Sequence, residues 1–211
     1  METQKNKFDA NKTIIKKDEK ILVVPRKDLF PEKAFNGFLP LEGFSSYLEI
    51  IKTHKEFKWR SEMELDPAYK QIIPYIVFIH QNKLFIMQRQ STASETRLQS
   101  KFSLGIGGHI RQEDIAGDDI FEWAKREFNE EVNYEGSLQV KPLGLVNYDE
   151  DAVGQVHLGF IILLTGDNNN ISVKSELKSG ELLSIEECQK HYQNMESWSQ
   201  FVFDFLKGAQ K

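Results

Sequence analysis

Three glutamates crowd into five positions of the chain beside an arginine, and their spacing is that of one face of a helix. Residues three and four apart are neighbours on a helix, so Glu127, Glu130 and Glu131 fall within one sector of roughly 100°, next to Arg126. Like charges at this spacing repel by about a few tenths of a kcal/mol per pair. Because hard cations prefer carboxylate oxygens, the cluster predicts a binding site for a divalent cation such as Mg²⁺.

The surrounding residues predict the helix that positions this cluster. Asp119 followed by Glu122 is typical of a helix start of the capping-box kind, and Asn133 stands where the chain leaves the helix, in a left-handed conformation that Asn tolerates. The apolar stripe that should face a core is formed by Phe121, Ala124, Phe128 and Val132. The carboxylates border this stripe, which places them at the edge of a crevice.

Residues 107–134 resemble the Nudix box. That family's pattern is a glycine, five residues, a glutamate, seven residues and then Arg-Glu-apolar-x-Glu-Glu-x-Gly-apolar. Residues 126–131 match its Arg-Glu-apolar-x-Glu-Glu core at every defined position. The segment Gly107-Gly108-His109 resembles the glycine pair that opens the box, where glycine lets the backbone approach a ligand or expose a carbonyl oxygen.

Two positions depart from the family's pattern. Asn133 replaces the glycine near the end of the box. An aspartate replaces the first glutamate of the pattern. The family's spacing places that residue at Asp118 when counted back from Arg126, but at Asp114 when counted forward from Gly108. The loop between them therefore carries a four-residue insertion. Asp118 is either a helix-start aspartate stabilised by the helix dipole or a carboxylate that supports the arginine.

The resemblance implies a fold and a reaction. The fold is an α/β/α sandwich with a mixed sheet, and the reaction is hydrolysis of a diphosphate linkage in a nucleotide-like small molecule, a nucleoside diphosphate joined to another group. The cofactor would be Mg²⁺ or Mn²⁺, which neutralises phosphate oxygens and activates water. The metal ligands so implied are the side chains of Glu127, Glu130 and Glu131 and the backbone carbonyl of Gly107.

The catalytic group that the resemblance implies comprises Glu130, Glu131 and Arg126. We expect Arg126 to orient a carboxylate by a charge-assisted hydrogen bond. Glu122 and Glu130 lie four residues away on either side and are alternative partners. The general base is either a glutamate of the box or a carboxylate from a later loop, for which Glu150 is the candidate.

Two further residues are expected to contact the substrate. His109 follows the glycine pair and Arg89 ends a predicted strand, so both can meet phosphate groups. His157 lies in a later strand, where its side chain either points at the same crevice or packs in the interior without a functional role; we favour the second interpretation.

Composition limits the class of protein. A net charge of −5 argues against a nucleic-acid-binding surface, which would be basic. The single cysteine, Cys188, excludes an internal disulfide framework and fits a reducing cytoplasm. The N-terminus has no apolar segment typical of a signal peptide, and no apolar run reaches membrane-spanning length. We therefore expect a cytoplasmic protein with no nucleic-acid or membrane partner.

The chain is expected to divide near residue 68. Residues 1–68 predict a small α/β extension, with an irregular loop over 29–42 and a helix over 44–54. This extension covers the substrate site or serves a homodimer interface. Residues 69–211 form the Nudix-like domain, which begins with a hairpin around Gln81-Asn82-Lys83. The chain also resembles an uncharacterised bacterial subfamily that has a GIGGHI loop and such an extension.

Two competing functions start from the same fold. One is a catalytically silent Nudix-fold protein that binds a ligand as a regulator; such proteins commonly lose the box carboxylates, which this chain keeps. The other is isopentenyl diphosphate isomerase, which relies on a catalytic cysteine. We disfavour it because Cys188 lies in a late helix, far in sequence from the box.

Overall fold

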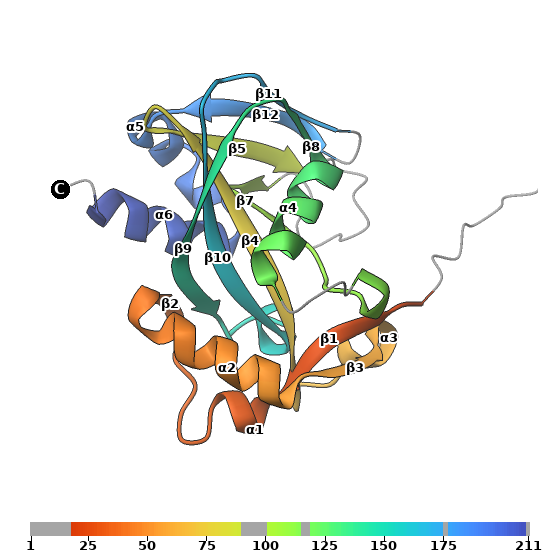
Figure 1. Cartoon of the computed structure of the whole chain (residues 1–211). Coiled ribbons are helices and arrows are strands. Elements are labelled where there is room, and N and C mark those ends of the chain that lie inside the picture. The colour runs from red at the N-terminus through yellow and green to blue at the C-terminus, as the bar shows by residue number, and fades with distance from the viewer. Residues whose placement is uncertain (1–17, 90–100, 115–118, 175–176, 210–211) are drawn as a thin grey trace, which may run out of the picture.

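The computed structural model describes residues 18–89, 101–114, 119–174 and 177–209 (Figure 1). Within this part of the chain, the main sheet has ten strands, of which six follow the order β12-β5-β4-β10-β9-β2. Its strands are β1 (Lys20–Pro25), β2 (Gly37–Pro40), β3 (Glu56–Trp59), β4 (Tyr69–His80), β5 (Lys83–Arg89), β6 (Phe102–Ser103), β7 (Gly105–Gly107), β9 (Leu138–Asn147), β10 (His157–Gly166) and β12 (Leu177–Leu183). A second sheet pairs β8 (Val132–Tyr134) with β11 (Ile171–Val173).

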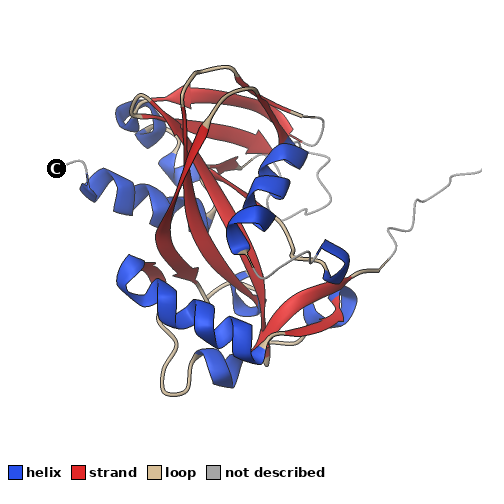
Figure 2. Ribbon diagram, in the orientation of Figure 1, coloured by secondary structure: helices blue, strands red, loops and turns tan. Residues whose placement is uncertain are grey.

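Helices cover the main sheet (Figure 2). The α-helices are α1 (Arg26–Leu29), α2 (Phe44–His54), α3 (Arg60–Met63), α4 (Ile120–Glu131), α5 (Ile185–Gln189) and α6 (Ser197–Ala209). Short 3₁₀ turns are η1 (Leu41–Gly43), η3 (Gln112–Asp114), η4 (Gly154–Val156) and η5 (Tyr192–Asn194). In the described part of the chain, no helix is long and apolar enough to cross a bilayer. The cytoplasmic location and the homodimer stay predictions.

The centre of the sheet is apolar on both faces. Side chains alternate along a strand, so Ile72 and Ile76 of β4 pack in the core that contains α2 and α4, whereas Tyr75 and Val77 pack in the core that contains α5 and α6. β4 pairs in parallel with β10, and the other strand pairs are antiparallel. The α/β/α sandwich with a mixed sheet is therefore confirmed.

The N-terminal segment contributes strands to the same sheet. β1 pairs with β3 and β4, and β2 pairs with β9. The helix expected over 44–54 is confirmed as α2, but the irregular loop over 29–42 is wrong in part. Gly37 adopts a φ of 92°, which suits glycine, and the chain then forms the edge strand β2. The proposed boundary near residue 68 lies at the start of β4 and remains a prediction.

The hairpin between β4 and β5 is confirmed. His80 pairs with Lys83, and the two residues between them, Gln81 and Asn82, have positive φ values of 46° and 63°. Two successive left-handed residues are the geometry that matches the twist of paired strands. This hairpin fixes the register of β5, on which β6 and β12 then pair.

Candidate functional site

Helix α4 forms where the sequence predicted a helix, and it buries an apolar face. Asp119 caps the helix by accepting a hydrogen bond from the backbone N–H of Phe121 (2.8 Å). The carboxylate of Glu122 instead contacts Nζ of Lys125 (2.6 Å). The buried residues of α4 and its C-cap are Ile120, Trp123, Ala124, Glu127, Phe128 and Val132. Phe121 is only half-buried, so the stripe is rotated toward Ile120 and Trp123, which sequence reasoning left out.

The end of α4 differs from the expectation. The helix ends at Glu131, and Asn133 is the central residue of β8, where it pairs with Ser172. Among the described residues other than glycine, only those of the β4–β5 turn have positive φ, so the left-handed exit at Asn133 is wrong. Val132 is the C-cap and begins β8. Lys174, after β11, satisfies two carbonyls of the last turn: its backbone N–H donates to that of Glu131 (2.8 Å), and its Nζ donates to that of Asn129.

Arg126 connects two of the three glutamates. Its Nη2 donates to Oε1 of Glu127 (2.6 Å) and its Nη1 donates to Oε1 of Glu130 (3.0 Å). Nη2 also donates to the backbone carbonyl of His109 (3.3 Å), which ties α4 to the loop after the glycine pair. Of the two partners expected for Arg126, Glu130 is therefore found. Arg111, which sequence reasoning missed, lies 3.7 Å from Oε1 of Glu130 through its Nη2.

Glu127 is the buried member of the cluster. It is 9% exposed, and burial raises the pKa of its carboxyl to about 7; the charge of Arg126 works against this shift and that of Glu130 adds to it. A carboxyl whose pKa lies in the neutral range is typical of a functional position. The shift means that the surrounding protein supplies too little positive charge for a buried carboxylate. A divalent cation bound at this carboxylate would supply the missing charge.

Gly108 makes room for Glu127. A Cβ atom at position 108 would lie 1.8 Å from Oε2 of Glu127, far inside any allowed contact. Gly108 has no left-handed φ, so the position needs glycine for clearance and not for backbone conformation. Gly107, the residue expected to offer a carbonyl to the metal, ends β7 opposite Tyr75. Gly108 therefore lies directly against the carboxylate of Glu127, whereas a Cβ at Gly107 would meet Ile73 and Tyr75.

The three glutamates do not share one point in space. Among the described residues, the group of three metal-ligating side chains whose ligand atoms all lie within 4.8 Å of one another is Glu64, His109 and His157. Glu127 and Glu130 meet instead at Arg126, and Glu131 is half-buried on the same helix. Glu64 carries no sequence signal that links it to the histidines, because it comes from the N-terminal segment.

Three other residues were expected in the site. Glu150 makes its contacts away from the glutamates of α4, Asp118 lies outside the described residues, and the side chain of Arg89, which ends β5, is not described. Glu150 is exposed, and its carboxylate accepts hydrogen bonds from Nδ2 of Asn36 (3.1 Å) and from the hydroxyl of Tyr148 (3.3 Å).

An ion pair that the sequence did not indicate joins the buried Lys70 to Asp149, in the loop between β9 and β10. Lys70 is 0% exposed and donates through Nζ to Oδ1 of Asp149 (2.7 Å), to the carbonyl of Gly154 (2.6 Å) and to that of His157 (3.2 Å). Burial lowers the pKa of Lys70 to about 8, although Asp149 works to raise it. Burial also works to raise the pKa of Asp149, but hydrogen bonds from Arg26 and Lys70 outweigh it and hold that pKa at about 2. The pair fixes the loop before β10.

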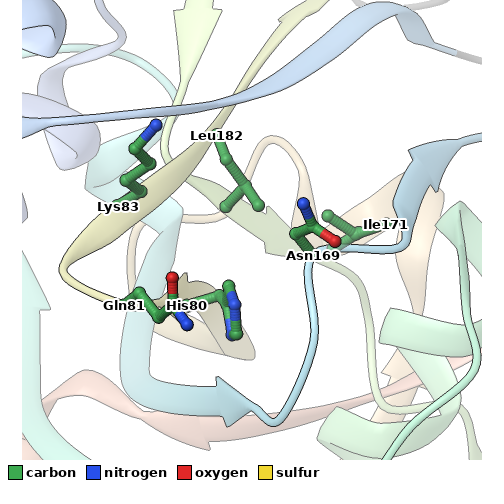
Figure 3. Close-up of a pocket in the computed structure, with 6 residues that line it drawn as sticks. All are labelled: His80, Gln81, Lys83, Asn169, Ile171 and Leu182. Atoms are coloured by element: carbon green, nitrogen blue, oxygen red, sulfur yellow. The ribbon is translucent and has the colours of Figure 1, made fainter.

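A hollow of about 300 Å³ lies at the far end of the β4–β5 hairpin (Figure 3). Its lining residues are His80, Gln81, Lys83, Asn169, Ile171 and Leu182. None of these residues has a carboxylate, and Nδ1 of His80 lies 2.9 Å from the carbonyl of Gly166. The hollow contains no member of the glutamate cluster, so it is not the site built by α4.

Comparisons with known proteins place the chain among relatives of nearly its own length. No protein-family profile matches the chain. The Bacillus subtilis protein YmaB is 35% identical over 208 residues, which cover 91% of this chain and 99% of that protein. The crystal structure of Tm1382, provisionally classed as a Nudix hydrolase, is 34% identical, covers 89% of this chain and 98% of its own, and superposes with a TM-score of 0.76.

A more distant structure shares the fold alone. The Nudix domain of Shewanella oneidensis NrtR, solved with ADP ribose, is 11% identical and superposes with a TM-score of 0.54. The match covers 67% of this chain and 89% of that domain.

Proposed function

The chain belongs to the Nudix hydrolase superfamily, and from that membership we propose that it hydrolyses the diphosphate linkage of a nucleoside diphosphate joined to another group. One observation carries the proposal: the buried carboxylate of Glu127 lies against Gly108, and Arg126 joins it to Glu130. The contact joins Gly108, from the first half of the box motif, to Glu127, from the second half. Membership in the superfamily then supports an enzyme of the hydrolase class.

The residues present fit a divalent cation of the Mg²⁺ or Mn²⁺ kind. Burial raises the pKa of Glu127 to about 7, which marks a carboxylate that a cation would stabilise in its charged form. Glu127 and Glu131 would be the principal ligands, with Glu130 and the carbonyl of Gly107 beside them. When bound, such an ion neutralises the oxygens of a diphosphate and lowers the pKa of a water molecule.

The chain's own residues orient the reacting groups. The guanidinium of Arg126 holds Glu127 and Glu130 in fixed directions by charge-assisted hydrogen bonds. Glu130 is exposed and Glu131 half-buried, so both can accept a proton from an attacking water. Glu150 would first have to leave Asn36 and Tyr148, which makes a glutamate of the box the better general base. His109 and Arg89 remain the proposed phosphate contacts.

The test is a substrate screen with Mg²⁺ or Mn²⁺. The panel contains nucleoside diphosphate sugars, dinucleoside polyphosphates, ADP-ribose, NADH, coenzyme A and oxidised nucleotides. Glu131→Gln should lower kcat by at least about 100-fold, because it removes a ligand and a charge at the reacting centre. Glu122→Gln is the matched control: it changes an exposed glutamate of the same helix that contacts Lys125. Full activity of the Glu131 variant would refute the proposal.

A ligand-binding regulator is the second candidate, and one observation favours it. In a preformed metal site, the carboxylate oxygens of Glu127, Glu130 and Glu131 would all lie within 4.8 Å of one another. In this structure they do not. The NrtR domain, solved with ADP ribose, shares this fold. Binding of ADP-ribose by calorimetry, together with no turnover of any compound in the panel, would favour the regulator over the hydrolase.

A further inference from the structure

A second group of metal-ligating side chains lies beside the box, and its members come from three separate parts of the fold. Glu64 follows α3, His109 follows the glycine pair after β7, and His157 begins β10. Figure 1 shows the loop after β7 running past β1 toward α3. The backbone N–H of Leu22 in β1 donates to the carbonyl of Ile110 (2.8 Å), so the N-terminal segment holds this loop in place.

The two histidines face each other through their Nε2 atoms, which lie 3.4 Å apart. Zinc binds histidine nitrogen at about 2.0–2.1 Å in tetrahedral geometry, which places two ligand nitrogens about 3.3 Å apart. The observed separation is therefore that of two imidazoles on one tetrahedral ion. Oε1 of Glu64 lies 4.0 Å from Nε2 of His109, so the carboxylate needs only a small shift to join them.

A hydrogen bond made by the other ring nitrogen of His157 sets the tautomer that a metal ligand needs. Nδ1 of His157 lies 2.7 Å from the carbonyl of Val153, which can only accept, so Nδ1 carries the proton and Nε2 presents its lone pair in the neutral ring. This arrangement is typical of histidines that bind metals. Oε1 of Glu64 accepts from Nε of Arg60 (3.2 Å), which orients the carboxylate.

A fourth possible ligand atom, the amide oxygen of Gln71, is close to the same point. Nε2 of Gln71 donates to the carbonyl of Met63 (3.2 Å), so its Oε1 is the atom that faces Nε2 of His109 at 2.7 Å. In the metal-free protein, Nε2 of His109 donates its proton to this oxygen. When Nε2 binds a metal, that proton moves to Nδ1, and the amide oxygen of Gln71 is free to take the fourth position.

We propose that Glu64, His109 and His157 bind a Zn²⁺ ion at a site separate from the carboxylates of α4. Two imidazoles and one carboxylate favour zinc over Mg²⁺, which prefers oxygen ligands. His157 is 7% exposed, whereas the Glu64 side chain is 30% exposed and gives the ion access from solvent. Because Arg126 of α4 donates to the carbonyl of His109, the ion fixes the loop that lies against Glu127. The proposal does not depend on hydrolase activity.

The test is a zinc titration of the full chain after chelator treatment, with a chromophoric chelator as competitor. The wild type should bind one tight equivalent. His157→Asn should weaken that equivalent by at least about 100-fold, because even the loss of an outer contact costs 10–100-fold. Asparagine keeps an N–H near the position of Nδ1 and has no atom at the position of Nε2, so the bond to Val153 can survive. His54→Gln, at an exposed histidine outside the group, should bind zinc as the wild type does.

Two more variants separate this site from the box and from misfolding. Glu64→Gln, at a partly exposed side chain, should weaken zinc by at least about 10-fold. Glu131→Gln should leave zinc affinity unchanged. Replacement of zinc by Co²⁺ should give the visible absorption of a tetrahedral ion in the wild type and not in His157→Asn. Zinc affinity that is unchanged in Glu64→Gln, or that is lost in Glu131→Gln, would overturn the proposal, as would the absence of tight zinc binding in the wild type.

Discussion

The contact between Gly108 and Glu127 gives the most direct test of the site. An alanine Cβ at position 108 would lie 1.8 Å from Oε2 of Glu127, whereas ordinary contact begins at 3.4 Å. The carboxylate must therefore move by the difference, about 1.6 Å, or the loop must move by as much. Gly108 has no left-handed φ, so alanine adds no backbone strain and the effect is purely steric.

The expected consequence is a loss of metal binding and of turnover in a protein that still folds. Misplacement of a reacting group by about 1 Å costs roughly 100-fold in rate, so Gly108→Ala should lower kcat by at least that factor. Overpacking of this kind costs about 1–3 kcal/mol of stability. Mn²⁺ affinity, followed by electron paramagnetic resonance, should fall by at least about 10-fold.

The control is another glycine-to-alanine change. Gly208 lies near the end of α6, with nothing within 4 Å of a Cβ built there. Gly208→Ala should leave Mn²⁺ affinity unchanged and should stabilise the helix by up to about 1 kcal/mol. A folded Gly108→Ala variant that binds Mn²⁺ with wild-type affinity would refute the assignment of Glu127 as a ligand.

Three further outcomes follow from buried groups outside α4. Asp149→Asn should lower the free energy of unfolding by about 3 kcal/mol, because it leaves the buried charge of Lys70 without its carboxylate partner; urea unfolding, with Glu150→Gln as the control, checks this. The folded-state pKa of Asp149, about 2, lies below its ordinary value, so the stabilisation is complete above about pH 4 and is lost as pH falls toward 2. The stability difference between wild type and Asp149→Asn should shrink over that range, and a difference that stays constant would contradict it. Burial raises the pKa of the Cys188 thiol to about 12, so a thiol reagent should react only with unfolded protein. Cys188→Ala should keep full turnover, and a loss of turnover would indicate that Cys188 takes part in catalysis.

Local patterns in the sequence were sufficient for helix α4 and for the grouping of charged side chains on it. The period of the apolar residues predicted α4, and the spacing of the glutamates placed them beside Arg126 with Glu130 as a partner. The two apolar runs on either side of Gln81, Asn82 and Lys83 likewise predicted the hairpin. These features follow from helix and strand geometry over a few residues, which no distant contact changed.

The expectations that were wrong concern segments whose structure depends on a distant partner. Nothing near Asn133 shows that it will pair with Ser172, so a strand replaced the predicted left-handed exit. The segment over 29–42 contains an edge strand only because β9 offers an open edge to β2. In both cases, backbone hydrogen bonds to a strand far along the chain decided the local conformation.

The sequence by itself determined that three carboxylates and an arginine lie on one helical face behind a glycine pair. Only the tertiary structure decided that Glu127 is the buried member and that it requires glycine at position 108. It also brought Nε2 of His109 to 3.4 Å from Nε2 of His157, which is 48 residues away in the sequence, and placed Glu64 beside them. The physical reason is that helical periodicity relates residues a few positions apart, whereas burial and ligand geometry depend on which distant segments the sheet brings together.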